Sequence, residues 1–241
     1  MNIVVQKFGG SSVSDINKLY KVCDRIIEEK KNNKYVVVVV SAQGDMTNRL
    51  IQEEKEITNE SSLENHDLLV SVGEQITVAK LSMCLNELGY KTKTFLGWQV
   101  PIITNSNHGD ADIEEVKTDK IIKELEKDNI VIVAGFQGID KNSEITTIGR
   151  GGSDTTAIAL AIALNAEKCE LYKDVDGIYS GDPKTKKNVI KYDKISYEKM
   201  LELSNKGAKV LHNKCIEMAR DNLLEVIVKS TFKNNKGTIV A

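Results

Sequence analysis

Apolar residues in the first 40 positions follow two different periods, which predict a strand, a helix and a second strand. Ile3–Phe8 is a short, largely apolar run typical of a strand, and Tyr35–Val40 is a wholly apolar run of the same length. Between the two runs, apolar residues recur at helical spacing from Ile16 to Ile27, after Ser14 or Asp15 as a candidate helix cap. This β-α-β pattern predicts an α/β protein with a parallel sheet and helices on both faces.

The same patterning continues to the end of the chain. Further strands are predicted at 91–96, 130–134, 169–172, 225–229 and 238–240, and further helices at 66–88, 119–128, 195–204 and 211–222. Residues 53–65 are charged and poorly patterned, so they predict an exposed helix-loop insertion. Residues 97–109 predict an irregular connection with a hairpin. With 241 residues, the chain is long enough for one α/β domain or two small ones.

A glycine-rich turn occupies the centre of this pattern, between a short extended segment and a helix. The turn runs from Ile148 to Ala157, and we expect Ser153 or Asp154 to cap the apolar helix that follows it. Glycines allow backbone N–H groups to approach a ligand, and a helix N-terminus carries partial positive charge. Arg150 adds a planar fork for a carboxylate or a phosphate. The turn therefore predicts an anion site, although an ordinary tight turn has the same composition.

Other polar turns also follow predicted strands, where parallel sheets bind their ligands. Lys7 precedes a run of glycines and serines, and Ser41 and Thr47 lie in a polar turn after the second strand. Two later segments, 173–184 and 206–210, contain the further candidate phosphate contacts Lys184 and Lys209. Each of these turns taken alone is also explained as a structural turn. Together their cations predict a clamp for phosphate groups.

Composition and charge exclude several classes of protein. The 33 basic and 35 acidic residues are dispersed and give a formal net charge of −2, so nothing indicates a nucleic-acid partner. The apolar run Val36–Val40 is far too short to span a membrane, and the first residues show no signal-peptide pattern. The 4 cysteines lack zinc-ligand spacing. We therefore expect reduced thiols in a cytoplasmic protein without membrane partners.

The inventory of reactive residues favours phosphoryl transfer. The sequence shows no Ser-His-Asp pairing, no metal-ligand cluster and no Cys/His nucleophile, so we expect no protein-bound metal. Phosphoryl transfer depends mainly on alignment and charge neutralisation, which lysines, an orienting Asp and Mg²⁺ can supply. A carboxylate acceptor, with a pKa of about 4, needs no general base at neutral pH.

The chain contains an ordered series of short motifs. They are Lys7–Ser12, Ser41-Ala42 with Thr47-Asn48, Val72–Glu74, Gly97–Gln99, His108-Gly109, Gly135-Phe136, Gly149–Ala157, Asp174–Tyr179 with Asp182-Pro183, and Gly207–His212. This series resembles the catalytic domain of aspartate kinase, which belongs to the amino-acid kinase fold. The resemblance implies a three-layer α/β/α sandwich with a mainly parallel central sheet. It also implies a substrate-binding part at about 1–140 and a nucleotide-binding part at about 141–241.

The same resemblance implies the reaction and the role of each site residue. The expected reaction is the ATP-dependent phosphorylation of the side-chain carboxylate of L-aspartate, with Mg²⁺ held mainly by the nucleotide phosphates. Lys7 would neutralise the transferring phosphoryl group, Asp154 would orient the lysines, and Arg150 would hold a substrate carboxylate. Substrate contacts are expected from Ser41, Thr47, Glu74, which pairs with the ammonium group, Arg150 and Ser153. Nucleotide contacts are expected from Lys7, Gly9, Gly10, Ser11, Lys173, Asp174, Tyr179, Lys184 and Lys209.

The chain departs from the family pattern at several positions. Lys173 stands where the family usually has Thr, and this cation could add a phosphate contact or crowd the adenine pocket. Lys184 is often Arg, Asn213 replaces a common Pro, and Asp112 stands where Arg is frequent. The family usually continues into ACT regulatory domains, whereas this chain stops near the expected end of the catalytic domain. We therefore expect no feedback inhibition by lysine or threonine on this chain alone, a homodimer, and a possible separate regulatory chain.

Two alternatives remain at this stage. The first is another kinase of the same fold, acting on glutamate or uridylate; the paired charges of Glu74 and Arg150 favour a zwitterionic amino acid instead. The second is a non-catalytic nucleotide-binding module of the same fold. The presence of Lys7, Arg150 and Asp154 argues against it.

Overall fold

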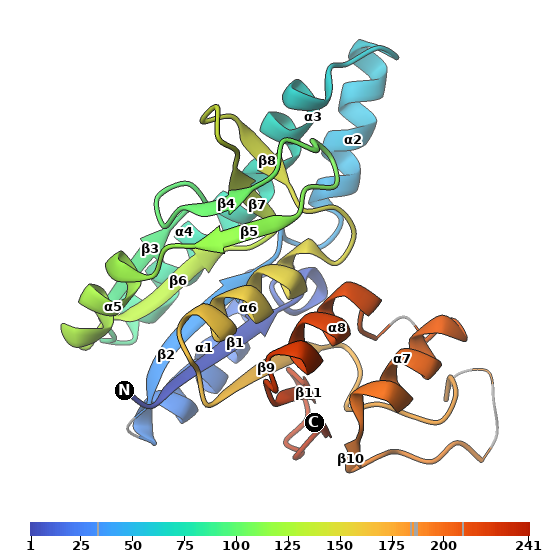
Figure 1. Cartoon of the computed structure of the whole chain (residues 1–241). Helices are drawn as coiled ribbons and strands as arrows, with labels where there is room; N and C mark the ends of the chain where they lie inside the picture. The colour runs from blue at the N-terminus through green and yellow to red at the C-terminus, as the bar shows by residue number, and fades with distance from the viewer. Residues whose placement is uncertain (33, 184, 186–187, 209) are drawn as a thin grey trace.

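The computed structural model describes the chain except for residues 33, 184, 186, 187 and 209. Within the described part, the larger of two sheets has its strands in the order β10-β12-β11-β9-β1-β2-β6-β3 (Figure 1). Their bounds are β1 Ile3–Phe8, β2 Tyr35–Val40, β3 Thr92–Phe95, β6 Ile130–Ala134, β9 Lys168–Lys173, β10 Lys194–Ile195, β11 Val226–Ser230 and β12 Thr238–Val240. The strands predicted from apolar runs are thus confirmed, with ends shifted by one or two residues.

This sheet is mainly parallel, as the β-α-β pattern predicts. β1 lies between β2 and β9 and is parallel to both, with Lys7 opposite Val39 on one side and Leu171 on the other. β6 is parallel to β2 and β3, while β12 is antiparallel to β11. Because parallel strands end at the same edge, the polar turns after β1, β2, β6 and β9 lie close together.

Helices cover both faces of this sheet and complete three layers. α1 (Ile16–Lys31) and α4 (Val72–Glu87) pack on one face, where Val36, Val38 and Val40 point. The other face, which carries Val37 and Val39, is covered by α5 (Asp119–Glu126), α6 (Gly152–Ala163), α7 (Tyr197–Asn205) and α8 (Asn213–Asp221). The three-layer α/β/α sandwich with a mainly parallel central sheet is therefore confirmed.

The segment between β2 and β3 differs from the sequence prediction. α2 (Met46–Ile57) begins inside the predicted polar turn, and α3 (Leu63–Val70) begins within the stretch predicted as an exposed insertion. Ser71 separates α3 from α4, where one helix was predicted. At this boundary Ser71 keeps helical dihedral angles, and its carbonyl oxygen accepts a hydrogen bond of 2.8 Å from the buried Gln137 side chain.

The stretch from α3 to α4, Leu63–Glu87, is long and apolar enough to cross a membrane by length and composition alone. Its apolar residues Val78, Leu81 and Leu85 nevertheless pack in the core beside α1 and the sheet. It also buries the carboxyl groups of Asp67 and Glu74. We interpret the stretch as core helices of the folded protein.

A smaller sheet lies beside α3, at the end of the larger sheet that carries the polar turns (Figure 1). Its strands are β4 (Ile102–Thr104), β5 (Ile113–Val116), β7 (Gln137–Ile139) and β8 (Ile145–Thr147), in the order β5-β4-β7-β8. β4 and β5 are antiparallel and confirm the predicted hairpin. β8 leads directly into the glycine-rich turn before α6.

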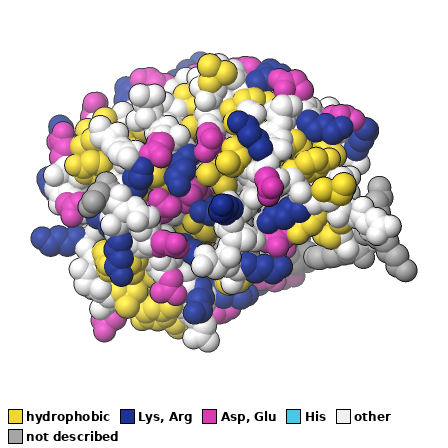
Figure 2. Space-filling model, turned by 90° about the horizontal axis from the view of Figure 1, so that it is seen from below, with side chains coloured by type: hydrophobic (Ala, Val, Ile, Leu, Met, Phe, Trp, Pro, Cys, Tyr) yellow, Lys and Arg dark blue, Asp and Glu magenta, His cyan; other side chains and the backbone are white. Residues whose placement is uncertain are grey.

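The surface carries charges of both signs, and the four cysteines form no disulfide. Figure 2 shows basic, acidic and apolar side chains interspersed on the face that it presents. All four cysteines are free, and Cys23, Cys169 and Cys215 are buried.

Candidate active site

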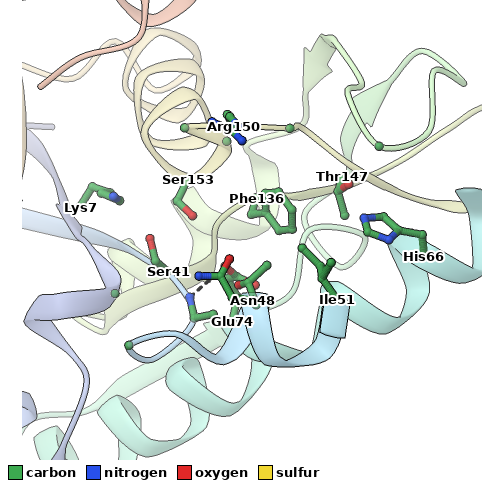
Figure 3. A pocket seen from close by; sticks show the side chains of 18 residues that line it. Lys7, Ser41, Asn48, Ile51, His66, Glu74, Phe136, Thr147, Arg150 and Ser153 are labelled. Atoms are coloured by element: carbon green, nitrogen blue, oxygen red, sulfur yellow. Dashed lines mark hydrogen bonds between the residues drawn. The ribbon is translucent and has the colours of Figure 1, made fainter. Parts of the chain in front are cut away.

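A cavity of about 650 Å³ lies where the turns after β1 and β2 meet the smaller sheet and the start of α6. In Figure 3, Lys7 and Ser41 lie toward one end, Thr147 and His66 toward the other, and Phe136 between them. The lining residues are Lys7, Gly10, Ser41, Ala42, Gly44, Thr47, Asn48, Ile51, His66, Glu74, Gly109, Phe136, Thr147, Gly149, Arg150, Gly151, Gly152 and Ser153. Every residue expected to contact the acceptor substrate is in this set.

Glu74 is a buried acid with one unused oxygen. It lies in the first turn of α4, is only 3% exposed, and accepts a hydrogen bond of 2.9 Å from the backbone N–H of Ala42 through Oε1. Oε2 has no hydrogen-bond partner among the described residues. Burial raises the pKa of Glu74 to about 7, although the Ala42 N–H and the charge of Lys7 act in the opposite direction. An unpaired buried carboxyl oxygen at a cavity is suited to a ligand cation.

Gly73 explains how α4 reaches the Ser41-Ala42 turn. A Cβ atom at Gly73 would lie 2.6 Å from the Cβ of Ala42, which is too close for any side chain without movement. Glycine therefore lets the first turn of α4 pack directly against the turn. That approach places the Glu74 carboxyl group within hydrogen-bonding distance of the Ala42 N–H.

Arg150 lies on the opposite side of the cavity from Glu74 (Figure 3). It is exposed, and among the described residues it has neither a hydrogen-bond nor an ion-pair partner. Gly149 and Gly151, with φ angles of 69° and 76°, flank it in the left-handed region that favours glycine. The guanidinium group is therefore available to a carboxylate or phosphate in the cavity.

The start of α6 differs in one detail from the sequence prediction. Gly151 is the N-cap residue, whereas Ser153 and Asp154 lie inside the first turn. The prediction that Ser153 or Asp154 caps the helix is wrong, because the glycine-rich turn enters the helix earlier than the polar side chains suggest. Their side chains are thereby free for other contacts: Ser153 lines the cavity, and Asp154 contacts two lysines.

Asp154 joins Lys7 and Lys173 beside the cavity. Lys7 Nζ lies 2.6 Å from Oδ1 of Asp154, and Lys173 Nζ donates a hydrogen bond of 2.6 Å to Oδ2. Burial alone would raise the pKa of Asp154, but the adjacent Lys173 and Lys7 hold it well below its usual range. The cluster is therefore two ammonium groups around one ionised carboxylate.

A second cavity, of about 440 Å³, lies on the far side of this cluster. It is lined by Gly151, Asp154, Lys173, Ser204, Gly207, Ala208, Val210, Leu211, His212 and Asn213. Because Gly151 lines both cavities, the start of α6 separates them. Asp154 and Lys173 face the second cavity, whereas Lys7 faces the first.

The expected nucleotide contacts are less closely gathered than the acceptor contacts. Gly10 lines the first cavity and Lys173 the second, while Gly9, Ser11, Asp174 and Tyr179 line neither. The Gly9 N–H donates to the carbonyl oxygen of Tyr172, and the Tyr179 hydroxyl donates a hydrogen bond of 2.8 Å to Asp176. Lys184 and Lys209 lie outside the described residues.

Three side chains that line the first cavity, those of Ile51, His66 and Thr147, lie outside every motif quoted for the resemblance. Ile51 shares one face of α2 with Thr47, at a spacing of four residues. Helical periodicity from Met46 would have located it, had the segment not been interpreted as a turn. His66 is held by Glu54 at 2.6 Å, and this contact between α2 and α3 gives no signal in the sequence.

Another contact between distant segments fixes the rim of the first cavity. Asp67 is fully buried, and its carboxylate accepts hydrogen bonds from the Gly109 N–H and the Thr147 hydroxyl. His108 Nδ1 lies 2.9 Å from the same carboxylate. This cluster anchors the loop after β4 to α3.

No group of three or more His, Cys, Asp or Glu side chains suited to hold a metal ion occurs among the described residues. A divalent cation here would therefore need most of its ligands from a bound substrate and water.

The chain is similar to known proteins over nearly its whole length. The sequence model of the amino acid kinase family matches residues 2–230. Aspartokinase of Bacillus sp. (strain MGA3) is 48% identical over all of this chain and 58% of its own length. Aspartokinase 2 of Bacillus subtilis is 46% identical over all of this chain and 59% of its own length. The chain thus spans less than three fifths of the length of these curated relatives.

Solved structures show the same similarity. Aspartate kinase from Synechocystis superposes with a TM-score of 0.89 at 38% identity, over 99% of this chain and 39% of that one. Aspartokinase III of E. coli in complex with aspartate and ADP gives a TM-score of 0.88 at 29% identity, over 99% of this chain and 64% of that one. UMP kinase from Ureaplasma parvum, at 20% identity and a TM-score of 0.72, shares the fold alone.

Proposed function

The chain belongs to the amino acid kinase family, and from this premise we propose that it is the catalytic part of an aspartate kinase. It transfers the γ-phosphoryl group of ATP to the side-chain carboxylate of L-aspartate, giving 4-phospho-L-aspartate. The observation that carries this proposal is the opposition of Glu74 and Arg150 across a cavity that also contains Lys7. The relatives named aspartokinase, 46–48% identical over the whole chain, support it.

The charges of the cavity suit an amino acid with a second carboxylate. The unpaired Oε2 of Glu74 accepts the substrate ammonium group, and Arg150 binds a substrate carboxylate in a bidentate manner. Ser41, Thr47 and Ser153 add hydroxyl groups to the same cavity. A substrate held at both ends presents its remaining carboxylate toward Lys7.

Phosphoryl transfer then requires little from the protein beyond charge and alignment. An oxygen of the ionised side-chain carboxylate forms a bond to the γ-phosphorus, the bond from that phosphorus to the β,γ-bridging oxygen breaks, and ADP leaves with its electrons. Lys7 neutralises charge on the transferring group, and Asp154 orients Lys7. No general base is needed, because a carboxylate with a pKa of about 4 carries no proton to remove at neutral pH. Mg²⁺, held mainly by the phosphates, would supply further charge neutralisation.

We place the nucleotide on the side of the second cavity. Gly9, Gly10 and Ser11 follow β1. Lys173 is the last residue of β9, the neighbouring strand, and Asp174 and Tyr179 follow it. This arrangement supports a division into a substrate-binding part at about 1–140 and a nucleotide-binding part at about 141–241, with Arg150 and Ser153 reaching across. Lys184 and Lys209 belong to the same proposed set.

The alternatives are weaker. A uridylate acceptor has no ammonium group for Glu74, and the similarity to UMP kinases is one of fold alone. A non-catalytic module has no use for an ionised Asp154 held between two lysines beside the acceptor cavity. We further propose a cytoplasmic homodimer that takes small-molecule substrates.

The test is aspartate-dependent ADP release with Mg-ATP, run beside glutamate, UMP and no acceptor. We expect turnover with L-aspartate alone. Lys7→Ala should lower kcat about 100-fold or more, because it removes the charge at the transferring phosphoryl group. Lys21→Ala, an exposed lysine of α1, is the matched control and should remain fully active.

Two results would contradict the proposal. Turnover with glutamate or UMP in preference to aspartate would assign a different kinase of the same fold. ATP binding without turnover on any acceptor would favour the non-catalytic module.

A further inference from the structure

Lys173 is a second cation beside Asp154, in addition to Lys7. In this chain the Lys173 side chain is 18% exposed, and its ammonium group lies 2.6 Å from Oδ2 of Asp154. The site therefore contains two cations on one buried carboxylate.

The strand register explains why this lysine meets Lys7. Ile3, Val5 and Lys7 point to the face of β1 that α6 covers, and Cys169, Leu171 and Lys173 point to the same face of β9. Lys7 is opposite Leu171, so Lys173 lies one same-face position further along the neighbouring strand. Both side chains thus extend toward the first turn of α6, where Asp154 lies between them.

The contact of one carboxylate, Asp154, with two lysines sets the net charge of the site. Each ammonium group contacts a different oxygen of one carboxylate, so the cluster has a net charge of +1. Without Lys173, Lys7 and Asp154 would form a neutral buried pair, and both oxygens would be available to Lys7. A neutral pair attracts a phosphoryl group less than a cluster with a net positive charge does.

The two cavities lie on opposite sides of the cluster of Lys7, Asp154 and Lys173. Lys7 lines the acceptor cavity, whereas Lys173 lines the second cavity together with Asp154. Lys173 therefore holds Asp154 from the side opposite to the acceptor. Because Lys173 contacts the Asp154 carboxylate from the side of the second cavity, Asp154 is held in place and keeps the Lys7 ammonium group directed at the acceptor cavity.

From these contacts we propose that Lys173 is a positioning residue for phosphoryl transfer, which holds Asp154 and thereby fixes Lys7 and the net positive charge of the site. The inference rests on the proposed function, because it assigns a role in the same reaction. It differs from a nucleotide-binding role for Lys173, which would affect ATP affinity and not the rate of the chemical step.

The kinetic test compares Lys173→Met, which keeps the length of the side chain and removes its charge, with Lys173→Arg. For the Met variant we expect kcat to fall roughly 10- to 100-fold, the effect of a misplaced catalytic group, with both KM values within about threefold of the original. The Arg variant should recover most of kcat, because it restores the cation on Asp154.

The matched control is Lys229→Met. Lys229 lies on β11, next to β9, is 20% exposed, and forms an ion pair of 3.0 Å with Glu170 on the other face of the sheet. The kcat of Lys229→Met should stay within about twofold of the kcat of the unmodified chain. If Lys173→Met instead raises the KM for ATP and leaves kcat unchanged, or changes neither, the positioning role is overturned.

A second readout does not depend on turnover. In ¹³C-labelled protein, the Asp154 carboxyl signal, assigned with Asp154→Asn, should titrate at higher pH in Lys173→Met and as in the unmodified chain in Lys173→Arg. An unchanged titration in the Met variant overturns the inference. Absence of aspartate turnover in the unmodified chain would count against the proposed function, while the titration would still decide whether Lys173 holds Asp154.

Discussion

At the scale of single residues, two buried acids of the site have opposite ionisation behaviour because their partners differ. Asp154 lies between two ammonium groups and stays ionised, although burial opposes its charge. Glu74 has one backbone N–H and an unpaired oxygen, so burial dominates and raises its pKa to about 7. Glu74 is therefore the acid whose charge depends on a bound ligand.

Glu74→Gln tests this dependence in catalysis. We expect the KM for L-aspartate to rise about 30-fold or more, which corresponds to about 2 kcal/mol for the loss of a buried charge pair. In the unmodified chain, kcat/KM for aspartate should fall as the pH is lowered through about 7, because protonated Glu74 cannot pair with the ammonium group. The Gln variant should lack this decline, and a pH profile shared by both proteins would contradict the assignment.

The same variant has a readout in stability. The folded-state pKa of Glu74, about 7, lies above the ordinary value of 4.5, so folding favours the protonated form. This contribution is present below pH 4.5 and is lost as the pH rises through 7. Relative to Glu74→Gln, the free energy of unfolding of the unmodified chain should therefore fall by about 3 kcal/mol between about pH 4 and pH 8. Urea unfolding at several pH values measures it.

At the scale of elements, the start of each helix decides where the site side chains point. α4 begins after a break at Ser71 and packs on the Ser41-Ala42 turn through Gly73. α6 begins at the left-handed Gly151, which leaves Ser153 and Asp154 inside the first turn. The acceptor cavity therefore depends on close contacts between helix starts and turns as much as on its polar residues.

Gly73→Ala tests the contact between α4 and the turn. In an ordinary helix interior this change stabilises by up to about 1 kcal/mol. Here the new Cβ would meet the Ala42 Cβ at 2.6 Å, so we expect a loss of about 1–3 kcal/mol and weaker aspartate binding.

The matched control for this variant is Ala79→Ser, at an exposed position of the same helix, which should change stability by less than about 0.5 kcal/mol. If urea unfolding shows that Gly73→Ala is more stable than the unmodified chain, the Ser41-Ala42 turn moves away from α4 at no cost in free energy and the prediction is wrong.

At the scale of the whole molecule, the face of the sheet opposite the site is joined by a buried charged network. Glu170, fully buried on β9, contacts Lys168 at 2.8 Å and Lys229 at 3.0 Å, and accepts a hydrogen bond of 3.1 Å from Gln6 of β1. The network thus links β1, β9 and β11. Two of these strands, β1 and β9, carry Lys7 and Lys173 on their other face.

Glu170→Gln should destabilise the fold by about 3 kcal/mol or more at pH 7, because it leaves two lysines without their shared partner. Burial opposes ionisation of Glu170, but Lys229 and Lys168 hold its pKa below the ordinary value. Its contribution to stability is thus present above pH 4.5 and is lost as the pH falls through the depressed folded-state pKa. The difference between the two proteins in urea unfolding should shrink below about pH 4.5.

Glu114→Gln, an exposed residue of β5, is the control and should change stability by less than about 0.5 kcal/mol. Equal stability of Glu170→Gln and the unmodified chain at pH 7 would contradict a stabilising role for the network.

Local patterns in the sequence determined the fold class, and the resemblance to aspartate kinase named the residues that are expected to contact the acceptor. Apolar runs and helical spacing are set by burial along one element, so they identified β1, β2 and α1 and the parallel sheet between its helices. Parallel strands end at one edge, which is why the turns containing Lys7 and Ser41 were expected to meet.

Tertiary structure alone decided the contacts between elements that are distant in the chain. The side chain of Gln137 donates a hydrogen bond to the carbonyl oxygen of Ser71, and His66 contacts Glu54. The sharing of Asp154 between Lys7 and Lys173 depends on the register of β1 against β9 and on the approach of α6. Periodicity reports whether a residue is buried and on which face it lies, but it does not report which other residue meets it there. That choice is made by the packing of the whole molecule.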